Sequence, residues 1–585
     1  MSKVKIVCTL GPASLTPDVL GKMMDAGLNV ARLNFSHGTH EGHGEALQLV
    51  RQLAEEKNLP ISVMLDTKGP EIRTTLVASD HEELVPEATV RLVPDDGEKC
   101  TAGAIRLTHP TLAEECEVGQ DLYIDDGTIH LKIEAREGTA LVCRVVVGGL
   151  LKDRKGVNVP GAQLSLPAMS DKDIDDIRWG VAQGVDSVAL SFVRDRADVL
   201  AARKVIEEAG GDLQLIAKIE SRQAVANLEE IADVVDGMMI ARGDLGVEIP
   251  TEDVPLVQKR IIDLCRRRGK FTIVATQMLD SMIRNPRPTR AEANDVCNGV
   301  LDGADCVMLS GESAAGKYPV GAVTTMATIA RRSEEALGRF GRQAPFVEDE
   351  TGVPEGIALA SVKLAQSTGA RAILCLTTSG VTAQLVSKFR PQAPIIALTP
   401  EVKTARALST YWGVTPLVVK EQSDGEKAIL EGIEAALQAG LVDRGDLVVI
   451  TAGFPMDVPG TTNTLQARVV SHVVGHGLSV WRGVVTARAC VCRSVEDLTR
   501  FEAGDILVVE QTDKDYVSAL RRAGGLICAE GGLTSHGALC SLEYHLPTIV
   551  GASGILDAVK NGSVLTLDAT RGLIYEGVAN VGSDR

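Results

Sequence analysis

Eight short apolar runs alternate with helical patterns over the first two-thirds of the chain, and this alternation restricts the fold more than any other feature. Short runs that are apolar throughout are typical of parallel strands buried on both faces. Strands that alternate with helices predict β-α-β units, and eight such strands match a TIM (β/α)8 barrel. The runs are residues 4–10, 30–35, 62–65, 187–192, 213–219, 238–241, 271–275 and 306–309.

The rest of the chain divides into further domains. The third and fourth runs are separated by alternating β-like segments with a D-D-G hairpin signal at Asp125, Asp126 and Gly127. We expect a catalytic barrel over residues 1–73 and 161–335, with a β-barrel lid domain inserted over 74–160. An α/β regulatory domain is expected over 350–472, and an extra domain of the swivelling type over 475–585.

Composition excludes several classes of protein. The formal charge of −18 argues against nucleic acid or an anionic membrane as partner. No apolar stretch reaches the ~20 residues of a membrane span, and the start of the chain runs directly into a strand rather than a signal peptide. The twelve cysteines contain no C-x-x-C pair, so we expect reduced thiols and a cytoplasmic location. A metal site at Cys490 and Cys492 is disfavoured by their spacing.

Charged and hydroxyl residues gather where the apolar runs end. The fifth run ends in Lys218 and Glu220, and the sixth continues into Arg242, Gly243 and Asp244. The carboxyl ends of barrel strands meet at one rim, which is where such enzymes carry their chemistry. Two carboxylates beside an ammonium group can hold Mg2+ together with substrate phosphate oxygens, which suggests phosphate or enolate chemistry. Further polar residues at strand ends are Arg32, Asn34, Ser36, His37, Asp66, Thr67, Lys68, Glu71, Arg73, Thr276, Ser310 and Glu312.

Several longer strings are similar to one family in the same order. They are K-I-V-C-T-L-G-P-A-S, N-F-S-H-G, L-D-T-K-G-P-E-I-R-T, K-G-V-N-V-P-G, A-K-I-E, A-R-G-D-L-G-V-E and P-R-P-T-R-A-E-A-N-D-V. Over roughly residues 1–470 the chain resembles pyruvate kinase. The resemblance implies transfer of a phosphoryl group from phosphoenolpyruvate to ADP, giving pyruvate and ATP in glycolysis. It also implies a homotetramer.

The resemblance also implies roles for individual residues. Glu220 and Asp244 correspond to the ligands of Mg2+ or Mn2+, and Lys218 corresponds to the lysine that faces the phosphoryl group and the developing enolate. The implied substrate-binding set is Arg32, Lys218, Ala241, Gly243, Asp244 and Thr276, of which Arg32, Lys218 and Thr276, with Arg73, are also the implied catalytic residues. The implied nucleotide-binding set is Asn34, His37, Arg73 and Lys155. The proton donor to enolpyruvate stays open.

A monovalent-cation site is implied as well. Asn34, Ser36, Asp66 and Thr67 correspond to the family's K+ ligands. Glutamate at the position of Glu71 accompanies K+ dependence in the family, so we expect a K+-activated enzyme. Two readings of Arg242 remain, a loop-fixing ion pair or a contact at a subunit boundary.

The regulatory region contains a loop suited to a phosphate. T-T-S-G-V-T at residues 377–382 offers backbone amides and a helix start, although ordinary capping by hydroxyl side chains explains it too. In the family this loop and a segment like P-G-T-T-N at 459–463 take a phosphorylated effector, here a sugar phosphate or a nucleotide. The implied residues are Thr377, Thr378, Ser379, Gly380 and Thr382. Gln384 stands where many relatives have arginine, which leaves the effector's identity open.

The tail contains G-G-L-T-S-H-G-A-L at 531–539, which resembles the phosphohistidine domain of phosphoenolpyruvate-utilising enzymes. Leu542 replaces the arginine that usually follows the histidine, so a structural role for His536 is favoured over phosphorylation. The runner-up function is a phosphohistidine-dependent pyruvate dikinase or phosphoenolpyruvate synthase. A catalytically dead sensor on the same fold is a third possibility, and it would require loss of Lys218, Glu220 or Asp244.

Overall fold

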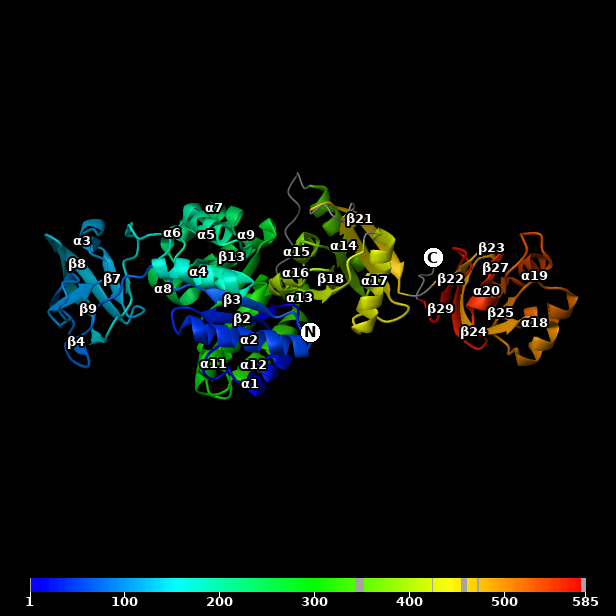
Figure 1. The fold of residues 1–585 in the computed structure, drawn as a ribbon, viewed down its shortest axis with the longest axis horizontal. Coiled ribbons are helices and arrows are strands. Elements are labelled where there is room, and N and C mark those ends of the chain that lie inside the picture. Colours follow the sequence, from blue (N-terminus) through cyan, green and yellow to red (C-terminus); the bar gives the residue numbers. More distant parts are fainter. Residues whose placement is uncertain (1, 342–351, 423, 454–459, 471–472, 580–585) are drawn as a thin grey trace. The chain divides into compact units, whose positions relative to one another are not determined.

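The computed structural model describes residues 2–341, 352–422, 424–453, 460–470 and 473–579. These residues form two compact units, which are considered separately (Figure 1). The first unit contains the described residues of 1–350 together with 387–390 and 401–416. The second contains those of 351–386, 391–400 and 417–585.

The first unit contains a closed barrel of eight parallel strands, as the sequence predicts. Around the ring the order is β1-β16-β15-β14-β13-β12-β3-β2, so each strand neighbours the next barrel strand in the chain. All eight expected runs are barrel strands, and most of their residues are buried because helices cover the outer face. The strands are Lys5–Thr9, Leu28–Asn34, Ser62–Asp66, Ser187–Leu190, Gln214–Ile219, Gly237–Ala241, Phe271–Ala275 and Cys306–Leu309 for β1, β2, β3 and β12 to β16.

The barrel helices begin and end at recognisable signals. α10 (Arg290–Asp302) starts with the expected capping box of Thr289 and Glu292 and ends at Gly303, which has φ +99°. The apolar face of α9 (Val254–Arg268) packs on the core through Ile261, Leu264 and Cys265. The others are α1 (Pro17–Ala26), α2 (His40–Glu56), α4 (Asp171–Gln183), α5 (Arg196–Glu208), α6 (Arg222–Ala226), α7 (Leu228–Val234), α8 (Arg242–Glu248), α11 (Gly311–Ala314), α12 (Pro319–Glu334) and α13 (Leu337–Phe340).

The insertion between β3 and β12 is built of β-strands, as expected. Hydrogen bonds join its strands into a six-stranded sheet, β11-β7-β8-β9-β5-β6, and a two-stranded ribbon of β10 and β4. Bridges from Arg73 to Gly156, beside β11, and from Thr74 to Leu107 of β6 join the two edges of the sheet, as expected for a β-barrel. The D-D-G signal makes the hairpin between β7 and β8, with positive φ at Asp125, Asp126 and Gly127. The elements are β4 (Glu82–Leu84), β5 (Thr89–Pro94), β6 (Ala104–Leu107), α3 (Leu112–Glu115), β7 (Asp121–Ile124), β8 (Ile129–Glu137), β9 (Ala140–Val147), β10 (Gly149–Leu151) and β11 (Val157–Asn158).

The α/β region has a five-stranded sheet in the order β19-β18-β17-β20-β21, with β21 antiparallel to β20. Its strands are β17 (Ala372–Leu376), β18 (Ile395–Thr399), β19 (Val414–Val418), β20 (Leu447–Gly453) and β21 (Thr462–Val469). Its helices are α14 (Val353–Thr368), α15 (Val381–Lys388), α16 (Val402–Ala407) and α17 (Gly425–Gln438). The segment 401–416 belongs to the first unit, where Lys5 Nζ donates to the Val414 carbonyl over 2.6 Å.

The C-terminal region contains an eight-stranded mixed sheet in the order β22-β29-β28-β24-β25-β26-β27-β23. The strands are β22 (Val473–His476), β23 (Leu478–Trp481), β24 (Val484–Cys492), β25 (Ile506–Val509), β26 (Gly525–Cys528), β27 (Thr548–Val550), β28 (Val564–Asp568) and β29 (Leu573–Glu576), with helices α18 (Val517–Leu520), α19 (His536–Tyr544) and α20 (Ile555–Ala558). All twelve cysteines are free thiols. Among the described helices, none is both long and apolar enough to cross a membrane.

Candidate active site at the carboxyl ends of the barrel strands

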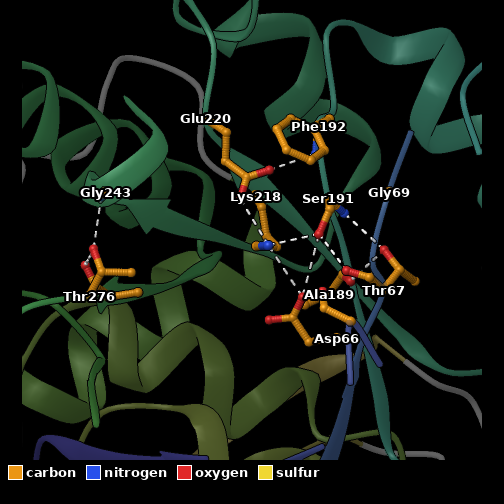
Figure 2. Close-up of polar contacts among 12 residues, drawn as sticks. Asp66, Thr67, Gly69, Ala189, Ser191, Phe192, Lys218, Glu220, Gly243 and Thr276 are labelled. Atoms are coloured by element: carbon orange, nitrogen blue, oxygen red, sulfur yellow. Dashed lines mark hydrogen bonds and ion pairs between the residues drawn. The ribbon is translucent and has the colours of Figure 1, made fainter. Parts of the chain in front are cut away.

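Lys218, near the end of β13, lies between three oxygen acceptors (Figure 2). Its ammonium nitrogen is 2.8 Å from Glu220 Oε1, 2.7 Å from Ser191 Oγ and 3.3 Å from Asp66 Oδ1. Burial disfavours the charge, but the carboxylates of Asp66 and Glu220 outweigh it and hold the lysine pKa well above its usual range. Lys218 is therefore a fixed positive charge at the rim.

Asp244 lies in the first turn of α8 and shares this region with Glu220. Its carboxylate makes no hydrogen bond to any described residue, and burial followed by the charge of Glu220 raises its pKa to about 7. A buried carboxylate whose pKa is raised by a neighbouring carboxylate marks a site that a divalent cation would stabilise. Within the described residues no cluster of three or more histidine, cysteine or acidic side chains is arranged to hold a metal alone. The pair therefore suits Mg2+ that takes its remaining ligands from substrate and water.

Thr276 follows β15 in a left-handed conformation, with φ +69°, which is unusual for a β-branched residue. Its hydroxyl accepts the Gly243 N–H over 2.9 Å and donates to the Ala275 carbonyl over 2.7 Å. Gly243 stands in the first turn of α8, where Ala241 is the N-cap. Thr276 and the amides of this turn thus face one region of the rim (Figure 2).

Arg242 holds this turn in place through an ion pair and two hydrogen bonds to backbone carbonyls. Its guanidinium makes two 2.7 Å contacts with the carboxylate of Asp295 on α10 and donates to the carbonyls of Ala275 and Thr276. These contacts agree with the loop-fixing ion pair, one of the two readings that the sequence leaves open.

The proposed K+ ligands lie around the ends of β2 and β3. Strand register places Asn34 opposite Asp66, and the Asn34 side chain accepts the Ser36 N–H over 3.2 Å. Asp66 is fully buried and binds Arg32 Nε over 2.6 Å. Thr67 Oγ1 accepts the Ser191 N–H over 3.0 Å. The site is rich in oxygen atoms, which hard cations prefer. Asp66 also interacts with the positive charges of Arg32 and Lys218.

A cavity of about 830 Å³ opens between the lid and the barrel rim. Asp244, Arg73 and Lys155 line it, together with Asp125 and Glu71. Arg73 is paired with Glu71, and Lys155 Nζ is 2.8 Å from Asp125 Oδ1. Both predicted nucleotide-binding cations are thus ion-paired in this conformation.

Of the other predicted nucleotide-binding residues, His37 is exposed, and its carbonyl accepts from His43 Nε2.

The predicted effector loop precedes α15. Thr377 Oγ1 accepts the Gly380 N–H over 2.9 Å, and Thr382 Oγ1 lies 2.7 Å from Thr462 Oγ1 on β21. The loop also contains Thr378 and Ser379. The structure thus places this loop beside the predicted effector segment 459–463. Pro459 of that segment lies outside the described residues.

His536 begins α19, with Nδ1 3.0 Å from Thr512 Oγ1 and Nε2 3.7 Å from Cys540 Sγ. Leu542 on the same helix is exposed. Both ring nitrogens therefore have protein neighbours, and no cation occupies the position of Leu542.

Sequence reasoning did not single out Ser191, Phe192 or Asp295 as functional residues. Ser191 and Phe192 follow β12, and the Phe192 N–H donates to Glu220 Oε2 over 2.6 Å. The fourth apolar run predicts core, and the serine near its end is the one local signal of a polar group there. Nothing in the local sequence marks Asp295 on α10, because its partner Arg242 begins α8, far away in the chain.

A closed parallel barrel whose rim carries a buried lysine beside a carboxylate pair defines a class of enzymes that stabilise phosphate or enolate charge with fixed cations. Three domain models match the chain: pyruvate kinase, barrel domain, over residues 1–323; pyruvate kinase, alpha/beta domain, over 355–467; and PEP-utilising enzyme, mobile domain, over 501–572. This chain belongs to the pyruvate kinase family.

Curated relatives match over almost the whole chain. The pyruvate kinase of Geobacillus stearothermophilus is 44% identical over 584 residues, covering 99% of both chains. The pyruvate kinase of Sporosarcina psychrophila is 42% identical and covers 99% of this chain and 100% of its own. Pyruvate kinase 2 of Synechocystis is 42% identical, with 98% and 97% covered. The similarity therefore includes the C-terminal region.

Proposed function

We propose that this protein transfers the phosphoryl group of phosphoenolpyruvate to ADP, giving pyruvate and ATP. The observation that carries the proposal is the buried ammonium of Lys218 beside Glu220 and Asp244 at the barrel rim. Family membership supports the same reaction. It favours this function over a phosphohistidine-dependent dikinase, whose histidine would need a free ring nitrogen and a supporting cation.

Each group at the rim has a task in this reaction. Lys218 faces the phosphoryl group and stabilises the charge that develops on the enolate oxygen. Glu220 and Asp244 would hold Mg2+ or Mn2+. When bound, that cation neutralises charge on phosphate and enolate oxygens. The hydroxyl of Thr276 and the amides of Gly243 and Asp244 orient the substrate carboxylate.

The arginines and the lid bind phosphate groups. Arg32 is held by Asp66 and by Thr9 Oγ1, so its orientation is set before substrate arrives. Arg73 and Lys155 exchange their present partners, Glu71 and Asp125, for phosphate oxygens of the nucleotide. Asn34 and His37 complete the nucleotide side of the site.

The remaining properties follow from the family. Asn34, Ser36, Asp66 and Thr67 would hold K+, and the loop 377–382 would take a phosphorylated effector. We further propose a homotetramer that works in the cytoplasm, which the twelve free thiols suit.

A coupled assay tests the proposal directly. Pyruvate formed from phosphoenolpyruvate and ADP is reduced by lactate dehydrogenase, with no inorganic phosphate added. Lys218→Met should lower kcat at least about 1000-fold, since removing one fixed group that stabilises developing charge typically costs about 100- to 1000-fold and this one is a full charge. Lys204→Met, at an exposed surface pair with Glu208, is the control and should match the wild type. Unchanged turnover in Lys218→Met would overturn the assignment.

A further inference from the structure

The hydroxyl of Ser191 completes the surroundings of Lys218. Ser191 is buried and has one proton, which it donates to the Thr67 carbonyl over 2.6 Å. Its lone pairs are therefore left to accept from Lys218 Nζ at 2.7 Å. The ammonium group of Lys218 thus donates one hydrogen bond, to Ser191, and forms ion pairs with Asp66 and Glu220. One hydrogen bond and two ion pairs thus hold the position of the charge (Figure 2).

The next residue holds the other member of the pair. Phe192 has φ +56°, a left-handed conformation that a bulky side chain adopts only when its surroundings impose it. In this conformation its N–H points at Glu220 Oε2, 2.6 Å away. Two adjacent residues thus fix Lys218 through a side chain and Glu220 through the backbone.

Gly69 provides the space for this turn. A Cβ atom at position 69 would lie 2.7 Å from the Phe192 ring and 2.8 Å from Ser191 Cβ, closer than such atoms come. Gly69 also has φ +78°, and its N–H donates to Asp173 over 2.9 Å. The loop after β3 therefore fits tightly against the turn after β12.

We propose that the turn of Ser191 and Phe192 is a positioning element for phosphoryl transfer, with Ser191 directing the ammonium of Lys218 and Phe192 directing the carboxylate of Glu220. The proposal rests on the proposed function and adds residues to it. Both residues act through the groups that they hold, and Phe192 also lines the cavity at the rim.

The arrangement also explains how an N–H group of Lys218 becomes available to bind the substrate. Glu220 is both a partner of the ammonium and a candidate cation ligand. When Glu220 turns Oε1 away from the ammonium, the hydrogen bond to Ser191 and the ion pair with Asp66 still hold Lys218. The side of the ammonium that faced Glu220 then meets a phosphoryl oxygen. Without Ser191 the ammonium would depend more strongly on Glu220.

Kinetics of Ser191→Ala test the first part of the proposal. We expect kcat to fall about 10- to 100-fold with the KM for phosphoenolpyruvate changed by less than about threefold, because a misplaced reacting group costs rate rather than binding. Ser187→Ala is a matched control, since Ser187 is a buried serine at the other end of β12 whose hydroxyl has no hydrogen-bond partner among the described residues. It should retain wild-type kcat.

Magnesium binding without substrate gives a second readout. Thermal unfolding is followed while MgCl2 alone is added, and the concentration at half of the maximal shift is compared. Ser191→Ala should need about two- to tenfold more Mg2+, the effect of one hydrogen bond, because Lys218 then competes more strongly for Glu220.

Either of two results overturns the proposal: a Ser191→Ala kcat within about twofold of the wild type, or a loss of kcat with an unchanged Mg2+ midpoint. Failure of the proposed function would look different. The wild-type protein itself would then form no ATP from phosphoenolpyruvate and ADP.

Discussion

Replacing Arg242 by methionine should damage the active site without touching substrate. The guanidinium holds Asp295 with two 2.7 Å contacts and the Thr276 carbonyl with a third. Methionine keeps much of the length of the side chain but removes every donor. The turn after β15 then loses the contacts that hold Thr276 and Gln277 in left-handed conformations, with φ +69° and +55°.

The expected magnitude follows from these contacts. Hydrogen bonds to a charged group contribute about 1.5–3 kcal/mol each, but the Asp295 side chain is 32% exposed, so solvent screening reduces the ion pair. A total of about 2–4 kcal/mol of unfolding free energy is reasonable. Each left-handed residue other than glycine costs about 1–3 kcal/mol, which is comparable. The turn therefore relaxes, and displacement of Thr276 by ~1 Å lowers kcat/KM for phosphoenolpyruvate about 100-fold.

Steady-state kinetics measure the predicted loss of kcat/KM, and thermal unfolding measures the predicted loss of stability. Arg267→Met is the control, because Arg267 forms an exposed pair with Asp263 one helical turn away and such pairs contribute about 0–1 kcal/mol. We expect the control to keep wild-type kinetics and a nearly unchanged Tm, whereas Arg242→Met loses both rate and several degrees of Tm. If Arg242→Met had wild-type kcat/KM and Tm, the reasoning about the clamped turn would be refuted.

Two further predictions concern cations. Replacing K+ by a bulky organic cation should lower activity at least about tenfold, because the oxygen cluster around Asn34 and Asp66 favours a small hard cation; full activity without a monovalent cation would contradict this. The raised pKa of Asp244, about 7, predicts that Mg2+ affinity falls about tenfold per pH unit below 7, since a proton must leave the carboxyl. Without Mg2+, stability should decrease as pH rises from 3.8 towards 7, because the unfolded chain ionises first. Mg2+ titrations followed by thermal shift at pH 6, 7 and 8 measure the change in Mg2+ affinity. Asp244→Asn is the control and should lose the pH dependence. A Mg2+ midpoint that does not change with pH would contradict the prediction for Asp244.

The barrel was predictable because its signals are local. Each apolar run is short, apolar throughout and followed by a helical pattern, and those properties depend only on neighbouring residues. The hairpin at Asp125 and Asp126 was predictable for the same reason. Closure of the lid is harder to predict, because it depends on pairing between distant segments: bridges from Arg73 to Gly156 and from Thr74 to Leu107 join the two edges of the six-stranded sheet.

The sequence alone determined which residue types stand at the strand ends, because a run of apolar residues that stops at Lys218, Glu220 or Asp244 can be read directly. Only the tertiary structure decided which of them meet. The register of β12 pairs Ala189 with both Asp66 and Ile216, so Ser191 comes to lie between Asp66 and Lys218 although the three are far apart in the chain. Arg242 and Asp295 meet because the packing of the barrel brings α10 beside the start of α8. Closure of the barrel brings distant strand ends within hydrogen-bonding distance, and no local pattern contains that information.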